Sequence, residues 1–337
     1  MNLNLEKPFI IAEIGGNHEG SLDYAKDLLI QAAEGGADAV KFQTYFPDKI
    51  VSKVEDPDRY KHFLKFSLSI DSYFELAELA KENKVMFMSS IWDSESLNAL
   101  DSIISIHKIG SGDLTNYPLI KEIITTGKPL IISTAMSSMK EVEETVNFIE
   151  NTQPEYRDAN KLAILQCVAM YGEPKDQYAN LNVISSLLQK FPNHTIGYSD
   201  HTVGNFAANI AVVLGARILE LHFTDDKSRE FRDHHISVTK EELIELKQNI
   251  LKTYALQGLS KKDPVLEIET SERIFEFRRS CYLKHDCKSG DELTVENLTT
   301  LRPNKGIDSR DYFRLLGKKL LVNKKAFEAI YWNEVED

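Results

Sequence analysis

Short apolar runs alternate with amphipathic segments eight times along roughly the first three quarters of the chain. The apolar runs are rich in β-branched residues, and several of the amphipathic segments end near glycine. Each run therefore predicts a strand, and each segment that follows predicts a helix. The predicted strands cover residues 8–14, 37–45, 85–90, 106–111, 129–135, 162–168, 195–200 and 217–224.

Eight strand–helix repeats predict an α/β fold of the (β/α)8 TIM-barrel type. The competing architecture is a doubly wound open sheet, which usually has fewer strands. Its dinucleotide-binding form also carries a GxGxxG motif after the first strand, and no such motif follows residues 8–14. We therefore expect residues 1–262 to form a closed barrel.

The hydrophobic periodicity of the sequence changes after the last predicted helix. Residues 263–278 are charged and lack strong periodicity, which is typical of a linker. Residues 279–337 then contain short candidate strands separated by turn signals, at 281–286, 288–294 and 297–303. This pattern predicts a small, mostly β domain after the barrel.

Composition and charge narrow the classes of function. The formal net charge of −12 argues against a nucleic-acid or anionic-membrane binder, although a local basic pocket for a small anion remains compatible with it. Three cysteines without a CxxC motif fit a reducing compartment. The N-terminus does not resemble a signal peptide, and no apolar run approaches the roughly 20 residues of a membrane span. We therefore expect a cytoplasmic protein.

Polar side chains gather where the predicted strands end. In a TIM barrel the carboxyl ends of the strands carry the chemistry. The polar residues at these ends are Glu13, Lys41, Gln43, Ser89, Ser90, Lys108, Ser111, Ser133, Thr134, Tyr171, Ser199, Asp200, His201, Glu220 and His222. Their recurrence at strand after strand predicts one polar site at that end of the barrel.

These residue types suit an anionic substrate. Lys41 and Lys108 are cations, and serine hydroxyls and the backbone amides of Gly110-Ser111-Gly112 add donors for phosphate or carboxylate. The serines that contribute are Ser90, Ser111, Ser133 and Ser199. The predicted site therefore resembles a cradle for a phosphorylated or carboxylated molecule.

In the last predicted strand, the polar residues Glu220 and His222 alternate with apolar residues. Side chains two apart on a strand point to the same face, so these two should share one surface. His201 and His222 end neighbouring strands, and two imidazoles near carboxylates suit a divalent transition metal such as Mn²⁺. Glu13 and Glu220 are candidates for proton transfer or for orienting water.

Several residues also have a purely structural interpretation. A single buried lysine or histidine is more often a satisfied structural residue than a catalytic one. We interpret Cys167 as a core residue, and His234 and His235 as solvated loop residues. The joint pattern at the strand ends is harder to explain structurally than any one member of it.

An ordered set of segments resembles the sialic acid synthase family. The segments are 11-IAEIGGNHEG-20, 39-AVKFQT-44, 108-KIGSGDLTNYPLI-120, 127-GKPLIISTAM-136, 197-GYSDHT-202 and 220-ELHFT-224. The tail 278-RRSCYLKHDCKSGDELTVENLTTLRPNKGID-308 resembles the antifreeze-like (SAF) domain of that family. The resemblance covers nearly the whole chain, in order and with similar spacing.

The resemblance implies a TIM-barrel transferase that condenses phosphoenolpyruvate with an N-acetylated aldose such as N-acetylmannosamine. The products would be a nine-carbon 2-keto-3-deoxy acid and phosphate, in carbohydrate biosynthesis. Residues matching the phosphoenolpyruvate-binding set are Lys41, Ser90, Lys108, Ser111, Ser133 and Ser199. Residues matching the reacting centre are Glu13, Asp200, Glu220 and Asp233, with Gln43 and Tyr171 on the sugar side.

The resemblance also implies a cofactor and an assembly. His201 and His222 match metal ligands, for Mn²⁺ or alternatively Mg²⁺ or Co²⁺. The family forms domain-swapped homodimers in which a tail arginine, here Arg302, reaches the active site of the partner subunit. No nucleic-acid or membrane partner is implied.

Some positions depart from the family pattern and leave the sugar open. Ala169 stands where an asparagine is typical, and residues 45–70 form a loop that is shorter than usual. Asn304 follows Arg302-Pro303 where glycine is frequent. A di-N-acetylated deoxy sugar, as in legionaminic acid synthesis, is an alternative substrate. The motif 12-AEIGGNH-18 fits the pseudaminic branch less well, since that branch tends to read AELSANH.

Two further interpretations remain, one from another class of function and one within enzymes. The chain could be a non-catalytic binder of a sugar or phosphosugar on the same scaffold, because fold alone does not determine function. It could also be a related synthase acting on a phosphorylated sugar, which should require extra basic residues for the second phosphate. No such residue stands out at the strand ends.

Overall fold

The structure is a computed structural model that describes all residues except 1–2, 4, 6, 159–160, 171–172 and 337. The chain forms two compact units, Met1–Gly258 and Leu259–Asp337. Each is described by itself. Among the described residues, no helix combines the length and the hydropathy that crossing a membrane would require.

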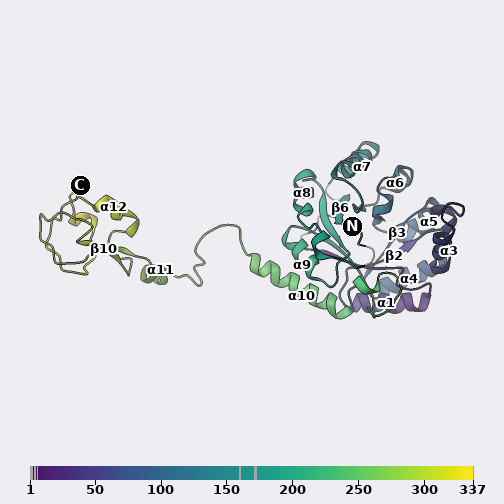
Figure 1. The fold of residues 1–337 in the computed structure, drawn as a ribbon, viewed down its shortest axis with the longest axis horizontal. Coiled ribbons are helices and arrows are strands. Elements are labelled where there is room, and N and C mark those ends of the chain that lie inside the picture. The colour runs from purple at the N-terminus through teal and green to yellow at the C-terminus, as the bar shows by residue number, and fades with distance from the viewer. Residues whose placement is uncertain (1–2, 4, 6, 159–160, 171–172, 337) are drawn as a thin grey trace. The chain divides into compact units, whose positions relative to one another are not determined.

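The first unit is a closed barrel of eight parallel strands (Figure 1). Each strand pairs with the next one along the chain, and β1 pairs with β8 to close the barrel. The strands are β1 (Phe9–Gly15), β2 (Ala39–Thr44), β3 (Met86–Ile91), β4 (His107–Ile109), β5 (Leu130–Ser133), β6 (Leu162–Cys167), β7 (Thr195–Asp200) and β8 (Ile218–His222). The predicted TIM barrel is confirmed, and every predicted strand overlaps an observed one.

Helices follow each strand and surround the barrel (Figure 1). The helices after successive strands are α1 (Leu22–Glu34), α4 (Ile70–Glu82), α5 (Ser94–Leu100), α6 (Tyr117–Ile124), α7 (Met139–Thr152), α8 (Val183–Lys190), α9 (Phe206–Val213) and α10 (Lys240–Gln257). Their starts follow capping chemistry: Ser138 with Glu141, and Thr239 with Glu242, form capping boxes at α7 and α10.

The segment 45–70 was expected to be a loop, and this prediction is wrong. It contains α2 (Pro47–Ile50) and α3 (Pro57–Phe66). Both helices begin with proline in the first turn, and Asp56 caps α3 by accepting from the backbone N–H of Arg59. Proline within a sequence pattern usually indicates the end of a helix. At the first turn it is favoured, because the backbone N–H that proline lacks would have no acceptor within the helix there.

Short 3₁₀ turns join several of these elements. Those in the barrel unit are η1 (Asp101–Ile103), η2 (Ser111–Asp113), η3 (Pro154–Arg157), η4 (Asp176–Tyr178) and η5 (His234–Ile236). Of these, η2 follows β4 and η5 lies between β8 and α10.

The interior of the barrel changes from apolar to polar along the strands. One apolar cluster, which includes Ile11, Ala39, Met88, Ile131 and Ile218, fills the end nearest the strand starts. Side chains of a strand alternate, so the next inward positions lie two residues further on. Those positions are Glu13, Lys41, Ser90, Ser133 and Glu220, all of which line one cavity. A larger cluster packs the outward faces of the strands against the helices.

Gly197 on β7 allows the apolar end of the barrel to close. A side chain there would put its Cβ 2.5 Å from the carbonyl oxygen of Ile218 and into contact with Leu165. Glycine is therefore the residue that lets β7 approach its neighbours. The strand continues with Ser199, which faces the cavity.

The second unit has its own apolar core. Its elements are α11 (Ser271–Phe277), β9 (Ser280–Leu283), β10 (Leu298–Leu301), η6 (Ser309–Asp311), α12 (Tyr312–Leu315) and η7 (Trp332–Glu334). β9 and β10 pair antiparallel, and isolated bridges such as Glu292 with Lys319 extend the β character. Two of the three predicted strands coincide with these strands, whereas residues 288–294 form bridges only. Within the predicted linker 263–278, α11 is a helix capped by Thr270.

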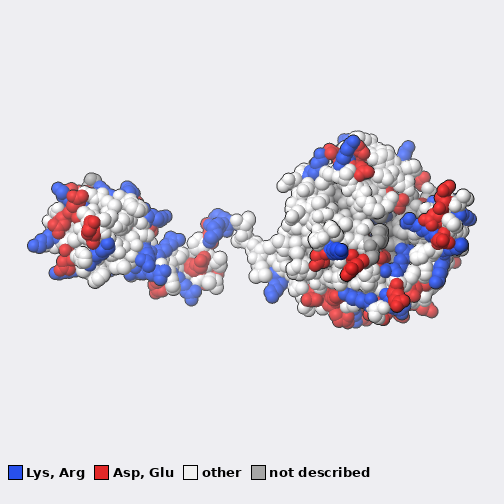
Figure 2. Space-filling model, in the orientation of Figure 1, with Lys and Arg blue, Asp and Glu red and all other residues white. Residues whose placement is uncertain are grey.

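Charged side chains of both signs are interspersed on the visible surface (Figure 2). The two lysines that the sequence singled out, Lys41 and Lys108, are instead buried inside the barrel, exposed by 2% and 1%.

Candidate active site

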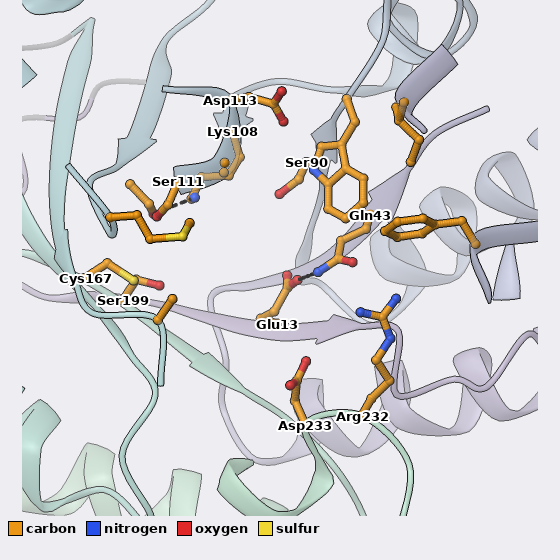
Figure 3. Close-up of a pocket in the computed structure, with 18 of the residues that line it drawn as sticks. Glu13, Gln43, Ser90, Lys108, Ser111, Asp113, Cys167, Ser199, Arg232 and Asp233 are labelled. Atoms are coloured by element: carbon orange, nitrogen blue, oxygen red, sulfur yellow. Dashed lines mark hydrogen bonds between the residues drawn. The ribbon is translucent and has the colours of Figure 1, made fainter. Parts of the chain in front are cut away.

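A cavity of about 910 Å³ opens at the carboxyl end of the barrel strands. Figure 3 shows Glu13, Ser90, Lys108, Ser111 and Ser199 converging on it from different strands and loops. Among the described residues that the sequence selected, those lining the cavity are Glu13, Lys41, Gln43, Ser90, Lys108, Ser111, Ser133, Ser199, His201, Glu220, His222 and Asp233. The tertiary structure therefore brings together residues that are up to 220 positions apart, from Glu13 to Asp233.

Lys41 is held between two buried carboxylates. Its Nζ lies 2.5 Å from Glu13 Oε2 and 3.5 Å from Glu220 Oε2, and it donates to Ser90 Oγ at 3.0 Å. Burial disfavours its charge, but the charges of Glu13 and Glu220 raise its pKa above the ordinary value. Lys41 is therefore a firmly protonated cation at neutral pH.

Lys108 forms the second cationic point. Its Nζ donates to Ser133 Oγ at 2.7 Å and to the Ile109 carbonyl at 3.1 Å, and it lies 3.6 Å from Glu220 Oε1. Burial lowers the pKa of Lys108, although Glu220 opposes this shift. Both lysines thus lie near the Glu220 carboxylate, and each donates a hydrogen bond to a serine hydroxyl.

Glu13 and Glu220 have opposite pKa shifts. Burial raises the pKa of Glu13, and the negative charge of Glu220 adds to this effect, while Lys41 opposes it. Burial also disfavours ionisation of Glu220, but the charges of Lys108 and Lys41 hold its pKa at about 2. Two neighbouring carboxyl groups whose pKa values diverge are typical of a division between proton transfer and charge stabilisation.

Further hydrogen bonds orient this centre. Gln43 Nε2 donates to Glu13 Oε1 at 2.8 Å, and Ser199 Oγ donates to Glu220 Oε1 at 3.0 Å. Ser111 lies in η2, and its Oγ accepts from the backbone N–H of Ala135 at 3.0 Å, which ties the β4 and β5 ends together. Glu13 Oε2 and Glu220 Oε2 accept no hydrogen bond from a described residue. Each forms an ion pair with Lys41 Nζ instead.

His201 and His222 face each other across the cavity wall. Their Nε2 atoms lie 3.4 Å apart, and His222 Nδ1 is 3.8 Å from Asp233 Oδ2. Burial lowers the pKa of His222 to about 4. Burial also disfavours the charge of His201, but the Cys167 sulfur, 3.6 Å from its Nδ1, and nearby carboxylates raise its pKa to about 9. At neutral pH these shifts favour a pair with one positive charge, on His201.

The histidine pair fits a divalent metal that keeps open positions. With metal–nitrogen distances of about 2.1 Å, two nitrogens on one ion are separated by about 3.0 to 3.4 Å, which agrees with the observed spacing. No group of three or more His, Cys, Asp or Glu side chains among the described residues could enclose an ion. Two imidazole ligands would leave coordination positions of such a metal for water or substrate.

Among the described strand-end residues that the sequence selected, Ser89, Thr134 and Asp200 do not line the cavity. Asp200 is buried but does not line the cavity. It alternates with Ser199 and His201, and its Oδ1 accepts from Tyr198 Oη at 3.1 Å and from the Thr202 N–H at 2.7 Å. Arg302 belongs to the second unit, where its guanidinium lies 5.5 Å from the ring centre of Phe277. Tyr171 lies outside the described residues.

Sequence reasoning missed other residues of the cavity. Cys167, interpreted as a core residue, is buried but also lines the cavity beside His201. Trp92 and Phe63 form an aromatic wall, and Arg59 and Arg232 add cations. Only Cys167 is a strand-end residue. The others come from α3 and from loops, so a search of strand ends could not have found them.

The expectation that His234 is solvated is wrong. It is fully buried, and its Nδ1 lies 2.6 Å from Thr224 Oγ1, with Glu19 at 3.5 Å from its Nε2. The loop after β8 folds back over the barrel, where Ser237 and Asn17 bond to each other. This fold-back also brings Asp233 to the cavity.

Comparison with known proteins matches the chain to one family and to relatives along nearly its whole length. Residues 28–262 match the NeuB family. The chain is 38% identical over 333 residues to the uncharacterized protein MJ1065 of Methanocaldococcus jannaschii, covering 98% of this chain and 95% of that protein. It is 35% identical over 343 residues to an N,N'-diacetyllegionaminic acid synthase of Legionella pneumophila, covering 97% and 94%.

A solved structure shares the fold. The N-acetylneuraminic acid (sialic acid) synthetase of Leptospira borgpetersenii, solved in complex with citrate, superposes with a TM-score of 0.71 and 29% sequence identity. The match covers 79% of this chain and 90% of that one.

Proposed function

The chain belongs to the NeuB family, and from this premise we propose that it is a nonulosonic acid synthase that condenses phosphoenolpyruvate with an N-acetylated aldose. The products are a nine-carbon 2-keto-3-deoxy acid and phosphate. The observation that carries the proposal is the cavity in which two buried lysines, four serine hydroxyls and a facing histidine pair converge.

The proposed reaction has three stages. C3 of phosphoenolpyruvate forms a bond to the aldehyde carbon of the open-chain sugar, and the aldehyde oxygen gains a proton to become a hydroxyl. Water adds to the cation left at C2 and loses a proton. The resulting tetrahedral carbon expels phosphate by breaking the bond between C2 and oxygen, which leaves the 2-keto group.

Lys41 and Lys108 bind phosphoenolpyruvate in this proposal, and the serines beside them complete the cradle. Both lysines are buried, so their attraction for an anion is weakly screened by solvent. Glu220 positions both ammonium groups before substrate arrives, with Oε2 3.5 Å from Lys41 Nζ and Oε1 3.6 Å from Lys108 Nζ. Fixed charges of this kind stabilise the charge that develops during reaction without reorganising.

Glu13 is the proton carrier of the proposal, and Glu220 is not. The raised pKa of Glu13 lies nearer to neutral pH, which is the condition for effective general acid–base catalysis. Glu13 accepts a proton from the water that adds to C2, and Gln43 fixes its orientation through the 2.8 Å hydrogen bond. Glu220, with a pKa of about 2, stays ionised throughout.

His201 and His222 would hold the divalent metal, with Mn²⁺ as the first candidate. Bound there, the metal supplies Lewis-acid polarisation of the sugar aldehyde. Asp233, 3.8 Å from His222 Nδ1, orients that imidazole so that its Nε2 faces the cavity. Asp200 acts from outside the cavity as a positioning residue for the β7 end.

The remaining assignments concern the sugar and the assembly. Gln43 and Tyr171 contact the sugar in this proposal, and Arg302 is contributed by the antifreeze-like domain of a partner subunit in a domain-swapped homodimer. The absence of an asparagine at Ala169 removes a polar contact, which favours a sugar with fewer hydroxyl groups than N-acetylmannosamine. A di-N-acetylated deoxy sugar fits this description.

The test is phosphate release from phosphoenolpyruvate with Mn²⁺ across a panel of N-acetylated hexoses and their di-N-acetylated deoxy counterparts. We expect release that requires both sugar and metal and that is lost in His222→Ala. Heavy oxygen placed on the bridging position of phosphoenolpyruvate should appear in the released phosphate, because the bond between C2 and oxygen breaks.

Two outcomes would contradict the proposal. Release that does not depend on sugar would indicate a phosphatase. A folded protein that binds metal and phosphoenolpyruvate, but does not consume phosphoenolpyruvate with any sugar, would favour a non-catalytic binder.

A further inference from the structure

The side chain of Asn17 is fully buried just after β1, and the reaction proposed above makes no use of it. Its Nδ2 donates to the carbonyl of Phe223 and to Ser237 Oγ, both at 2.9 Å. Its Oδ1 accepts from the backbone N–H of Asp233 at 3.3 Å. One amide side chain thus uses both of its donor hydrogens and its acceptor oxygen on residues 206 to 220 positions further along the chain.

All three partners of Asn17 belong to one loop, residues 223–238, which we call the β8–α10 loop. The loop leaves the barrel after β8 and returns beside it, because the N–H of Val238 donates to the carbonyl of His222 at 2.7 Å. Asn17 bonds to the first residue of this loop and to two residues of its returning part. It therefore ties the whole loop to the end of β1.

Asn17 fixes the backbone of Asp233 at both of its polar groups. The N–H of Asp233 bonds directly to Asn17, and the Asp233 carbonyl accepts from Ser237 Oγ at 2.7 Å. That Ser237 hydroxyl in turn accepts from Asn17. Asn17 and Ser237 are both fully buried, so water does not readily replace a bond lost here.

The exact position of Asp233 matters because its carboxylate lies at the limit of contact with His222. Asp233 Oδ2 is 3.8 Å from His222 Nδ1, a buried atom that has no hydrogen-bond partner in the described part of the chain. A hydrogen bond weakens steeply beyond its usual length, so a small displacement of Asp233 decides how firmly it orients the imidazole. Asn17 is the side chain that sets this displacement.

The neighbouring residue Arg232 shows that this part of the loop must be held in place. Its φ angle is +54°, in the left-handed region that residues other than glycine rarely adopt. A Cβ on Gly16 would lie 3.0 Å from Arg232 Nε, so the turn that carries Asn17 packs closely against this residue. Figure 3 shows Arg232 and Asp233 side by side at one edge of the pocket. Backbone strain persists only where the surroundings maintain it, and the bonds of Asn17 lie directly beside it.

We propose that Asn17 is a positioning residue that acts on the reaction through Asp233. It holds the Asp233 carboxylate beside His222 and thereby fixes the imidazole whose Nε2 faces the metal position. Asn17 does not itself line the cavity, so its effect must pass through the loop. The inference rests on the proposed function, because it requires the metal-binding role of His222.

The test is a double-mutant cycle on the whole chain with Asn17→Ala and Asp233→Asn. Mn²⁺ affinity is measured without substrate by titration calorimetry, and kcat and KM for phosphoenolpyruvate are measured with the sugar that the wild type prefers. Asn17→Ala alone should weaken Mn²⁺ binding and lower kcat by about 10- to 100-fold each, the usual effect of disturbing the groups that orient a metal ligand. KM for phosphoenolpyruvate should stay near the wild-type value. In the Asp233→Asn background, Asn17→Ala should change affinity and kcat by about twofold or less, because the residue through which it acts is already removed.

A purely structural role would produce a different pattern. Asn17→Ala should lower the melting temperature in both backgrounds, so its stability loss is additive while its effects on Mn²⁺ affinity and kcat are not. Tyr156→Phe is the matched control, because it removes a buried hydroxyl that donates to the Lys128 carbonyl near the start of β5, outside the cavity. It should lower the melting temperature and leave Mn²⁺ affinity and kcat unchanged. If Asn17→Ala does not fold, Ser237→Ala replaces it in the cycle, since this change removes the link to the Asp233 carbonyl.

The possible results distinguish a failure of the positioning role from a failure of the proposed function. Equal losses of Mn²⁺ affinity and kcat in both backgrounds would overturn the positioning role, as would wild-type values in a folded Asn17→Ala variant. If the wild type consumes no phosphoenolpyruvate with any sugar, the proposed function is contradicted, while the Mn²⁺ titrations still decide whether Asn17 acts through Asp233. A wild-type chain that binds no Mn²⁺ would overturn both the metal assignment and the role of Asn17.

Discussion

Lys41 Nζ and Glu13 Oε2 lie 2.5 Å apart inside the barrel, and both side chains are only 3% exposed. The two residues come from neighbouring strands that pair in register, Glu13 opposite Lys41. An ion pair so deeply buried is weak evidence for stability, because desolvation offsets much of the attraction. It is better explained as part of a catalytic device.

Glu13→Gln should remove the proton carrier while keeping the size of the side chain. We expect kcat to fall by about 10²- to 10⁴-fold, the usual contribution of general acid–base catalysis. KM for phosphoenolpyruvate should change little, since Lys41 keeps Ser90 and Glu220 as partners. The pH profile of kcat should lose the limb that the raised Glu13 pKa produces above the ordinary carboxyl range. An unchanged pH profile in the variant would assign that limb to another group.

Metal binding should release a proton. The His201 pKa of about 9 means that this imidazole is protonated at neutral pH, and a ligand must give up its proton to bind metal. The affinity for Mn²⁺ should therefore fall about tenfold for each pH unit below 9, which titration calorimetry in buffers of different ionisation enthalpy can measure. His222→Ala should abolish this binding, with Lys61→Gln as the control. Mn²⁺ binding that is independent of pH would contradict the ligand assignment.

Lys108 and Glu220 should be coupled in stability. Lys108→Met leaves Glu220 with one fewer cation, and breaking a buried pair in this way costs about 3 to 5 kcal/mol. Lys108→Met combined with Glu220→Gln should recover part of that loss, because no uncompensated charge remains near that position. Denaturant unfolding of the two single variants and the double variant measures the coupling. Additive losses would mean that the two residues do not interact.

Gly197→Ala should be strongly destabilising. The added methyl group would lie 2.5 Å from a backbone oxygen of Ile218, which cannot move aside as a flexible side chain could. Overpacking of this kind costs about 1 to 3 kcal/mol or more. Gly112→Ala is the matched control, because nothing lies within 4 Å of a Cβ there. Equal melting temperatures for the two variants would be inconsistent with the tight approach of β7 and β8.

His107 should make stability depend on pH. It is fully buried, its Nε2 lies 3.0 Å from Asp101 Oδ1, and its Nδ1 has no partner, so a second N–H would be buried unpaired. Burial lowers its pKa to about 4, although Asp101 opposes the shift. The unfolded chain therefore binds a proton that the folded chain does not, and stability is lost as pH falls from about 6.5 to about 4.

The lowered pKa of His107 corresponds to about 3 kcal/mol of folding stability, which should be present above pH 6.5 and lost below pH 4. His107→Phe should flatten the pH dependence of the unfolding free energy by about one proton in that window. His18, whose pKa burial also lowers to about 4, should keep its own contribution in the variant. A variant with the wild-type slope would contradict the assignment to His107.

The barrel and most of the polar centre could be predicted from the sequence. The β-branched runs of the strands and the capping residues of the helices are local properties of the sequence. The strand–helix unit, which recurs eight times, can therefore be recognised from neighbouring residues. The alternation of Glu220 with His222 is local too, and both line the cavity. The same reasoning located Lys41 and Lys108, because strand ends of a barrel must meet at one end.

Other features depend on which face a residue takes and on segments far apart. Asp200 follows Ser199 by one residue, and this single step turns its carboxylate away from the cavity towards Tyr198. The opposite pKa shifts of Glu13 and Glu220 arise from distances to Lys41 and Lys108 across four strands. Such distances exist only once the barrel has closed.

The second cationic cluster was beyond sequence reasoning altogether. Arg59 lies on α3 and Arg232 in the loop after β8, and both guanidinium groups approach the ring of Phe63. The sequence by itself determined that this chain forms a barrel with a polar end, because periodicity and strand chemistry are local. The tertiary structure decided which carboxyl group has a raised pKa and where the guanidinium of Arg232 lies, because burial and charge proximity are properties of the folded chain.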